Sequence, residues 1–321
     1  MISVLSRASA RCCATRTAPA VLPTASAVSS ALTRLWKDGK FKSKRVVLGA
    51  GNQRVLVREH TAPRMPLAQL RQALPYQVQD LLPVPVAETI LDFYPIEPSP
   101  QAPDTEIRGL LVAALKDAVE TNVAALSDAG LSVIQVDLAP FAGIRAITQA
   151  AAPEGTHTVV SIAPRTTTIS VIKDGIPQFV RIVPAGGETI TDAVAEILNA
   201  DRATSEKVKR HLGLEQGADP RHKPVSQAML DALKGIFGSI RSTNGYYLSN
   251  STDDAVDSVI LLGAETALPG FARAVVEYVG LPVSVGRPLA GITVGPDVPA
   301  ALIQRRELDL AVPIGLALGN A

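Results

Sequence analysis

The sequence of 321 residues is poor in aromatic side chains, in cysteine and in net charge. Aromatic residues make up 4% of the chain and the formal net charge is +1. No excess charge therefore indicates nucleic acid or an acidic surface as a partner. No apolar run reaches the ~18 residues that a membrane-spanning helix needs, so we expect no direct membrane insertion.

Cysteine and histidine are too few and too scattered to build a site of their own. The only cysteines are the adjacent Cys12 and Cys13, which excludes a disulfide framework and a zinc site built on thiolates. The four histidines show no spacing typical of zinc ligands. We therefore expect no metal site held by cysteine or histidine, and the cysteine usage favours a reducing compartment.

From about residue 30 onward, extended segments alternate with amphipathic helices. Hydrophobic residues make up 47% of the chain and charged residues 19%, which is typical of a globular protein. The alternation predicts an α/β architecture. A helix beginning near Leu67 carries apolar residues at Leu70, Leu74 and Val78, a stripe that ordinary core packing explains, and Pro75 predicts a kink. A final helix is expected over 308–318, apolar on most faces.

The stretch 156–187 predicts three short strands joined by two tight turns. Asp174-Gly175 between two β-rich runs is a strong hairpin signal. The other turn, residues 163–167, is rich in hydroxyl side chains. Gly186-Gly187 precedes a helix, for which the spacing of Thr189 and Asp192 predicts a capping box. Exposed amides at such turns and helix starts bind anionic oxygens, so the stretch is a candidate phosphate site.

The segment 1–29 differs from the rest of the chain. It holds Arg7, Arg11 and Arg16, no acidic residue and many Ala, Ser and Thr. This composition is typical of an organelle transit peptide, and also of a truncated or frame-shifted gene start in a GC-rich gene. We expect the second of these, because the segment supplies no alternating strands for the sheet that follows.

Several segments, in the same order, resemble the PilM branch of type IV pilus assembly proteins, members of the actin-like ATPase superfamily and relatives of FtsA. They run from about residue 30 to the C-terminus, and together they are specific. The matching segments are KSKRVVLGAGNQRVLVRE, PRMPLAQLRQAL with LLPVPVAETILDF, VIKDGIPQFVRIVPAGGETITDAVAE, SEKVK, VILLGAETALPGFARAVVEYVGLPVSVGRPLAGI and AVPIGLALG.

The resemblance implies an actin-like (ribonuclease H-like) α/β fold of two lobes with a small inserted subdomain. Residues 30–152 would form a partial first lobe that lacks its first strands, and 153–321 the second lobe, with the final helix returning to the first. The implied function is a bacterial cytoplasmic scaffold at the inner membrane. It would bind the tail of a PilN-like bitopic protein beside the inserted subdomain, and other platform and motor components.

The resemblance also implies a cleft for ATP with Mg²⁺. Carried over residue by residue, the cofactor-binding positions are Ala163, Arg165, Thr166, Thr167, Gly186, Gly187, Glu206, Lys209, Gly263 and Ala264. No catalytic residue is assigned, because Ser161 stands where the family has an acidic residue. Ala264 and Glu265 replace glycines near the base, and the first phosphate hairpin has no counterpart.

We therefore expect a scaffold with weak or degenerate ATP binding. The alternative is an active ATPase or small-molecule kinase of the same fold, for which Ser161 lacks the carboxylate that positions a metal and a nucleophile. A polymerising membrane tether would need a basic amphipathic helix at the C-terminus, and the chain ends in LALGNA.

Overall fold

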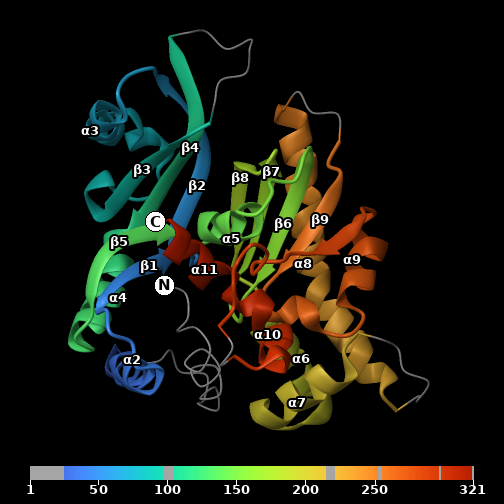
Figure 1. Cartoon of the computed structure of the whole chain (residues 1–321). Helices are drawn as coiled ribbons and strands as arrows, with labels where there is room; N and C mark the ends of the chain where they lie inside the picture. Colours follow the sequence, from blue (N-terminus) through green and yellow to red (C-terminus); the bar gives the residue numbers. More distant parts are fainter. Residues whose placement is uncertain (1–24, 97–104, 215–220, 252–254, 296–297, 320–321) are drawn as a thin grey trace.

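The computed structural model describes residues 25–96, 105–214, 221–251, 255–295 and 298–319 (Figure 1). Its helices are α2 (Ala25–Gly39), α3 (Leu67–Gln77), α4 (Lys116–Asp128), α5 (Ala139–Thr148), α6 (Gly187–Leu198), α7 (Arg202–Leu212), α8 (Lys223–Asn250), α9 (Phe271–Val279), α10 (Ala300–Arg306) and α11 (Ala311–Leu318). Its strands are β1 (Arg45–Ala50), β2 (Val55–Pro63), β3 (Thr89–Pro95), β4 (Glu106–Leu115), β5 (Ser132–Leu138), β6 (Thr156–Ile162), β7 (Thr167–Lys173), β8 (Ile176–Val183), β9 (Ser258–Leu262) and β10 (Val283–Val285).

A five-stranded sheet in the order β10-β9-β6-β7-β8 forms one side of the molecule (Figure 1). β6, β7 and β8 are antiparallel neighbours, and β9 runs parallel to β6. The predicted hairpin is present: Lys173 pairs with Ile176, and Asp174 and Gly175 adopt positive φ angles of 50° and 81°. Positive φ at both central residues is typical of the tight turn that Asp-Gly favours.

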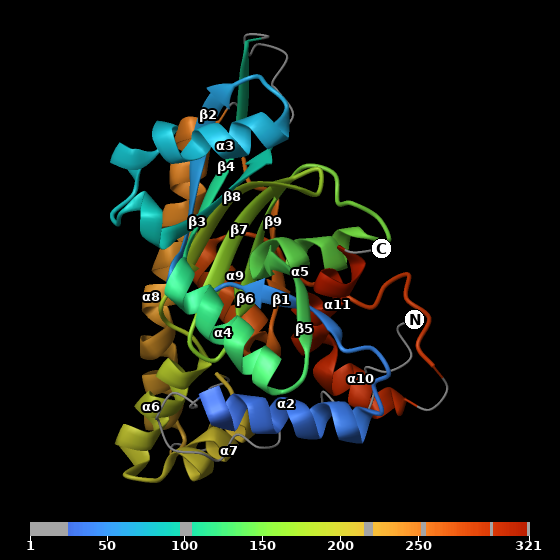
Figure 2. The same cartoon turned by 90° about the vertical axis from the view of Figure 1, so that its left-hand side faces the viewer.

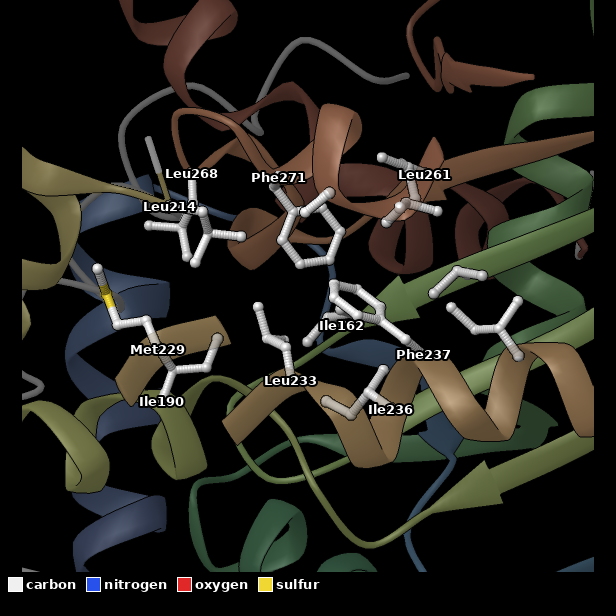
Figure 3. Packing of buried hydrophobic residues seen from close by; sticks show 14 of the residues in the cluster. Ile162, Ile190, Leu214, Met229, Leu233, Ile236, Phe237, Leu261, Leu268 and Phe271 are labelled. Carbon is white, nitrogen blue, oxygen red and sulfur yellow. The ribbon is translucent and has the colours of Figure 1, made fainter. Parts of the chain in front are cut away.

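Successive side chains along a strand point to opposite faces of the sheet, so this sheet contributes side chains to two hydrophobic cores. Val160 and Ile162 pack with α6, α8 and α9, whereas Val159 packs with α5 and α11. Figure 3 shows Leu233 and Phe237 of α8 beside Phe271, and the two phenyl centroids are 6.0 Å apart. Burial on both faces fixes the register of the sheet, and with it the position of the turns at its edge.

A second, three-stranded antiparallel sheet, β2-β4-β3, carries α3 on one face (Figure 1). Leu70, Leu74 and Val78 are fully buried against this sheet, so the apolar stripe is core. α3 continues past Pro75 to Gln77, and the Val78 amide donates to the Leu74 carbonyl; the kink expected at Pro75 stays a prediction. Burial of one continuous face keeps the last turn helical despite the missing amide of proline.

A third sheet has two parallel strands, β1 and β5, within the described residues. α11 packs against α5 and β1, although its sequence lies far from both. The approach is close: a Cβ on Gly315 would overlap the Ala142 carbonyl, and Arg145 Nη1 donates to the Gly315 carbonyl at 2.7 Å. The predicted final helix is divided here, into the 3-10 helix η4 (Glu307–Leu310) and α11.

α2 begins at Ala25, so residues 25–29 are helical and the N-terminal segment expected to end at residue 29 is shorter. α2 lies alongside α4 (Figure 2). The buried Ser29 hydroxyl donates to the Ala125 carbonyl at 2.8 Å and links the two helices. The expectations for residues 1–24 lie outside the described residues.

Candidate functional site

The predicted phosphate turn and the start of α6 bond directly to each other. The Gly187 amide donates to the Ala163 carbonyl at 3.0 Å, and the Glu188 amide donates to the Pro164 carbonyl at 2.7 Å. A Cβ on Gly186 would overlap the Ala163 carbonyl, so only glycine fits there. The amides that a helix start normally offers to a phosphate are thus already engaged.

This contact also corrects the predicted start of α6. The helix begins at Gly187, two residues before the capping box proposed for Thr189 and Asp192. Thr189 lies inside the first turn, where its hydroxyl accepts a hydrogen bond from the Gly186 amide at 3.4 Å. The carbonyl groups of Ala163 and Pro164, each 24 residues before the amide that it binds, cap the helix, which local spacing does not reveal.

The side chains of the turn contact protein groups as well. Arg165 Nε donates to Glu188 Oε2 at 3.0 Å and links the turn to the first turn of α6. The fully buried Thr167 donates its hydroxyl to the Ala185 carbonyl at 2.8 Å. Thr166 is half-buried and its carbonyl accepts from the Ala163 amide at 2.9 Å. The turn is therefore held by one bond within it and by bonds to Ala185 and Glu188 before and at the start of α6.

A charged cluster of Lys209 and Arg210 with Glu206 and Glu265 lies next to this turn. Lys209 Nζ is 2.6 Å from Glu206 Oε2 and 3.0 Å from Glu265 Oε2. Arg210 Nη2 is 2.6 Å from Glu265 Oε1, and Arg210 Nε is 2.9 Å from Glu206 Oε1. Lys209 is 1% exposed and Glu265 3% exposed, so the central pair is buried. Two cations and two carboxylates balance, as buried charges require.

The backbone and Thr191 complete the cluster. Lys209 Nζ donates to the Gly187 carbonyl at 3.2 Å and to Thr191 Oγ1 at 2.8 Å. The Thr191 hydroxyl lies 2.7 Å from Glu206 Oε2. The cluster thereby joins α6 and α7 to the 3-10 helix η3 (Ala264–Ala267), which carries Glu265.

The protonation of the cluster follows from these contacts. Burial raises the pKa of Glu206, but the hydrogen bond and the charge of Lys209 outweigh burial, so the pKa is lowered overall. Burial lowers the pKa of Arg210, and the charges of Glu265 and Glu206 outweigh it, so that pKa is raised overall. Both shifts favour the ionised forms of the two groups.

The turn after β9 lies against the end of β6. Gly263 has φ 87°, and a Cβ there would overlap the Ile162 carbonyl, so this position requires glycine. The Ala264 carbonyl accepts a hydrogen bond from Arg210 Nη1 at 2.9 Å. The structure therefore brings the ten predicted positions together at the ends of β6 and β9 and the starts of α6 and η3, with α7 beside them.

Sequence reasoning missed three members of the cluster. Glu265 is identified from the sequence only as a replacement for glycine near the base, and its burial and its ion pairs are not predicted. Arg210 and Thr191 were not identified. The spacing of Glu206, Lys209 and Arg210 places all three on one side of a helix, and this pattern could have indicated an ion-pair cluster. Its partner Glu265 lies too far along the chain for spacing to reveal.

The phosphate end of this site does not fit ATP. A Cβ on Gly187 would overlap the Glu265 carboxyl group, so a carboxylate already occupies the space beside the first turn of α6. Glu188 adds a second carboxylate at the same helix start. Both carboxylates are paired with cations of the chain, Glu265 with Lys209 and Arg210 and Glu188 with Arg165, so the cations and the amides that a polyphosphate would need are already engaged. No cluster of three or more His, Cys, Asp or Glu side chains suited to a metal is found among the described residues.

A hollow of ≈ 240 Å³ lies apart from the charged cluster, between β1 and α4. Its walls include the consecutive residues 48–52, the start of β2 and the end of β4. Ala118 and Val119 of α4 line its apolar side, and Asn52, Arg54 and Asn122 supply polar groups. The hollow therefore lies where the two-stranded and the three-stranded sheets meet.

In the part of the chain that the structure describes, no helix is both long and apolar enough to span a membrane.

Comparison with known proteins gives the fold and the family. The solved structure named "PilM-PilN type IV pilus biogenesis complex" superposes with a TM-score of 0.82 at 24% identity, covering 94% of this chain and 89% of that chain. The fold is thus the two-lobed actin-like α/β fold. FtsA from Streptococcus pneumoniae is 22% identical over 196 residues, 56% of this chain and 43% of that protein. FtsA from Bacillus subtilis is 28% identical over 109 residues, 34% of this chain and 24% of that protein.

The matches to both FtsA proteins span less than half of those proteins' lengths. The match to the family model is far more extensive: the model described as "Type IV pilus assembly protein PilM" matches residues 20–321. The ordered segments in the sequence, the actin-like fold and this match agree, and the chain belongs to the family of type IV pilus assembly proteins PilM.

Proposed function

We propose that this protein is a cytoplasmic scaffold of the type IV pilus assembly platform, peripheral to the inner membrane through its partners. It binds the cytoplasmic tail of a PilN-like bitopic protein and connects that protein to other platform and motor components. Family membership supports this role, and a relative of the same fold has been solved as a PilM-PilN complex.

The observation that carries the proposal is the hollow between β1 and α4. An extended, largely apolar peptide suits it, because Val55, Ala114, Ala118 and Val119 supply apolar walls. Residues 48–50 of β1, which pairs only with β5 among the described residues, and the following residues 51 and 52 also line the hollow. Backbone groups at a strand edge can pair with an added strand, while side-chain pockets give specificity. The resemblance places the partner's tail beside the inserted subdomain. In this proposal that subdomain includes the three-stranded sheet, next to which the hollow lies.

In this proposal the ATP cleft is degenerate, and any ATP binding is weak. Ser161, at the end of β6, offers a hydroxyl where metal-assisted hydrolysis needs a carboxylate. Among the described residues of the cleft, the amides at the start of α6 bind the turn carbonyls, and Lys209 and Arg210 bind Glu265. We therefore favour a scaffold over an ATPase or a small-molecule kinase.

The test is binding of a labelled peptide with the sequence of the partner's N-terminal tail, measured by fluorescence anisotropy. Ala118→Arg places a long charged side chain in the hollow, and we expect it to weaken binding at least about tenfold. Ala124→Arg is the matched control, because Ala124 is an exposed residue of the same helix and does not line the hollow.

Binding by the native protein and by Ala124→Arg, with loss in Ala118→Arg, is the expected result. If the native protein does not bind the peptide, the proposed partner is wrong. If Ala118→Arg and Ala124→Arg bind equally well, the hollow is not the docking site. Circular dichroism spectra of the two variants establish that both are folded.

A further inference from the structure

We propose that Lys209, Arg210 and the start of α6 form an anion-binding site that the chain fills with its own carboxylate, Glu265. The second lobe is therefore held together without a bound nucleotide. The inference rests on the geometry of the charged cluster and does not depend on the partner proposed above.

The position of Glu265 is that of a ligand. Its carboxyl group lies against Gly187, at the first turn of α6, where the helix dipole favours negative charge. Two cations approach it, Lys209 Nζ at 3.0 Å from Oε2 and Arg210 Nη2 at 2.6 Å from Oε1. A helix start with two converging cations is the usual environment of a bound phosphate or sulfate.

The carboxylate fills this environment imperfectly. Glu265 Oε2 is buried and accepts no hydrogen bond, although Lys209 Nζ is only 3.0 Å away. Lys209 Nζ instead donates to the Gly187 carbonyl, to Thr191 Oγ1 and to the Glu206 carboxylate, so its contact with Oε2 is an ion pair without a hydrogen bond. An ammonium group has three donors, and those of Lys209 are directed at these three groups, so none remains for Oε2.

Glu265 also fixes the surrounding elements. The residue belongs to η3, whose Ala264 carbonyl is held by Arg210 of α7. Lys209 connects the same α7 to the Gly187 carbonyl of α6. The Glu265 carboxylate adds its own contacts to Lys209, Arg210 and Gly187, so α6, α7 and η3 are joined without a bound anion. Binding of a ligand stabilises only the state that holds it, whereas a side chain does so at every ligand concentration.

Replacement of Glu265 tests the inference. Glu265→Gly removes the carboxylate, leaves one excess buried cation and opens the space beside Gly187. We expect its melting temperature to fall by about 6–12 °C in chloride buffer and to rise again with inorganic phosphate at constant ionic strength. The native protein should show no such phosphate dependence. Addition of about 1 mM Mg·ATP should raise its melting temperature by less than about 2 °C.

Glu265→Gln provides a second test that does not need an open space. It keeps the shape of the side chain and removes its charge, so we expect a fall in melting temperature without recovery in phosphate. Glu277→Gln is the control, because Glu277 Oε1 forms an exposed pair with Arg273 Nε at 2.8 Å. A fall in Glu265→Gln no larger than in Glu277→Gln overturns the inference.

Two further results would also overturn it. One is a folded Glu265→Gly protein that does not respond to phosphate. The other is a native protein that Mg·ATP stabilises strongly, with the effect lost in Lys209→Met. Neither result bears on peptide binding at the hollow, so this inference can be refuted while the proposed function stands, and the reverse.

Discussion

Lys209→Met gives the clearest energetic test of the charged cluster. Methionine keeps most of the buried volume of the side chain but leaves Glu265 without one of its two cations. Breaking a buried ion pair from one side costs about 3–5 kcal/mol, because a charge remains buried and uncompensated. Arg210 Nη2 remains 2.6 Å from Glu265 Oε1 and retains part of the compensation. We therefore expect a loss of about 3 kcal/mol in the free energy of unfolding, at the low end of that range.

Urea unfolding at neutral pH, followed by far-ultraviolet circular dichroism, measures this loss. The double variant Lys209→Met/Glu265→Leu removes both charges and should recover about 2 kcal/mol relative to the sum of the single variants. Lys234→Met is the matched control, because Lys234 Nζ contacts Asp231 Oδ1 at 2.6 Å on an exposed surface, and its stability should be unchanged. If Lys209→Met is as stable as Lys234→Met, the cluster does not stabilise the fold.

Two further predictions concern the interface of α11 and the acid limit of stability. Gly315→Ala places a Cβ against the Ala142 carbonyl and should lower the free energy of unfolding by about 1–3 kcal/mol, measured as a lower melting temperature. Gly238→Ala on α8 is the control, because nothing lies within 4 Å of its Cβ, and it should not destabilise the protein. Equal effects of the two changes would contradict the close packing of α11. Because the pKa of Glu206 is lowered in the folded state, its stabilisation is present above its unfolded pKa of about 4.3 and is lost as the pH falls through the lower folded value. Melting curves of the native protein and of Glu206→Gln should therefore differ at neutral pH and converge in acid, and a constant difference down to pH 3 would refute this assignment.

The sequence predicts best what depends on neighbouring residues. The Asp174-Gly175 turn and the three strands within 156–187 lie where local patterns place them. The alternation of apolar and polar residues and the turn preference of Asp-Gly each depend on a few neighbouring residues, so the sequence alone reveals them. The Leu70, Leu74 and Val78 stripe is core, as its spacing favours.

The parts that the sequence does not predict depend on residues distant along the chain. The carbonyls of Ala163 and Pro164 cap α6, and this tertiary contact outweighs the local capping pattern at Thr189. Glu265 is neutralised by cations 55 and 56 positions before it, so its burial follows only from the fold. The ten positions that the resemblance implies lie in one region of the structure, and their role in binding a cofactor stays a prediction. The contacts in that region depend on Glu265, which departs from the family pattern.

The most direct test of the account is the affinity of the partner's tail peptide measured with and without Mg·ATP. A scaffold held together by Glu265 binds the peptide with the same dissociation constant in both conditions, and Ala118→Arg weakens that binding at least about tenfold. Failure of the peptide to bind under either condition would contradict the scaffold. An affinity that rises about tenfold or more on addition of Mg·ATP would contradict a second lobe that needs no nucleotide.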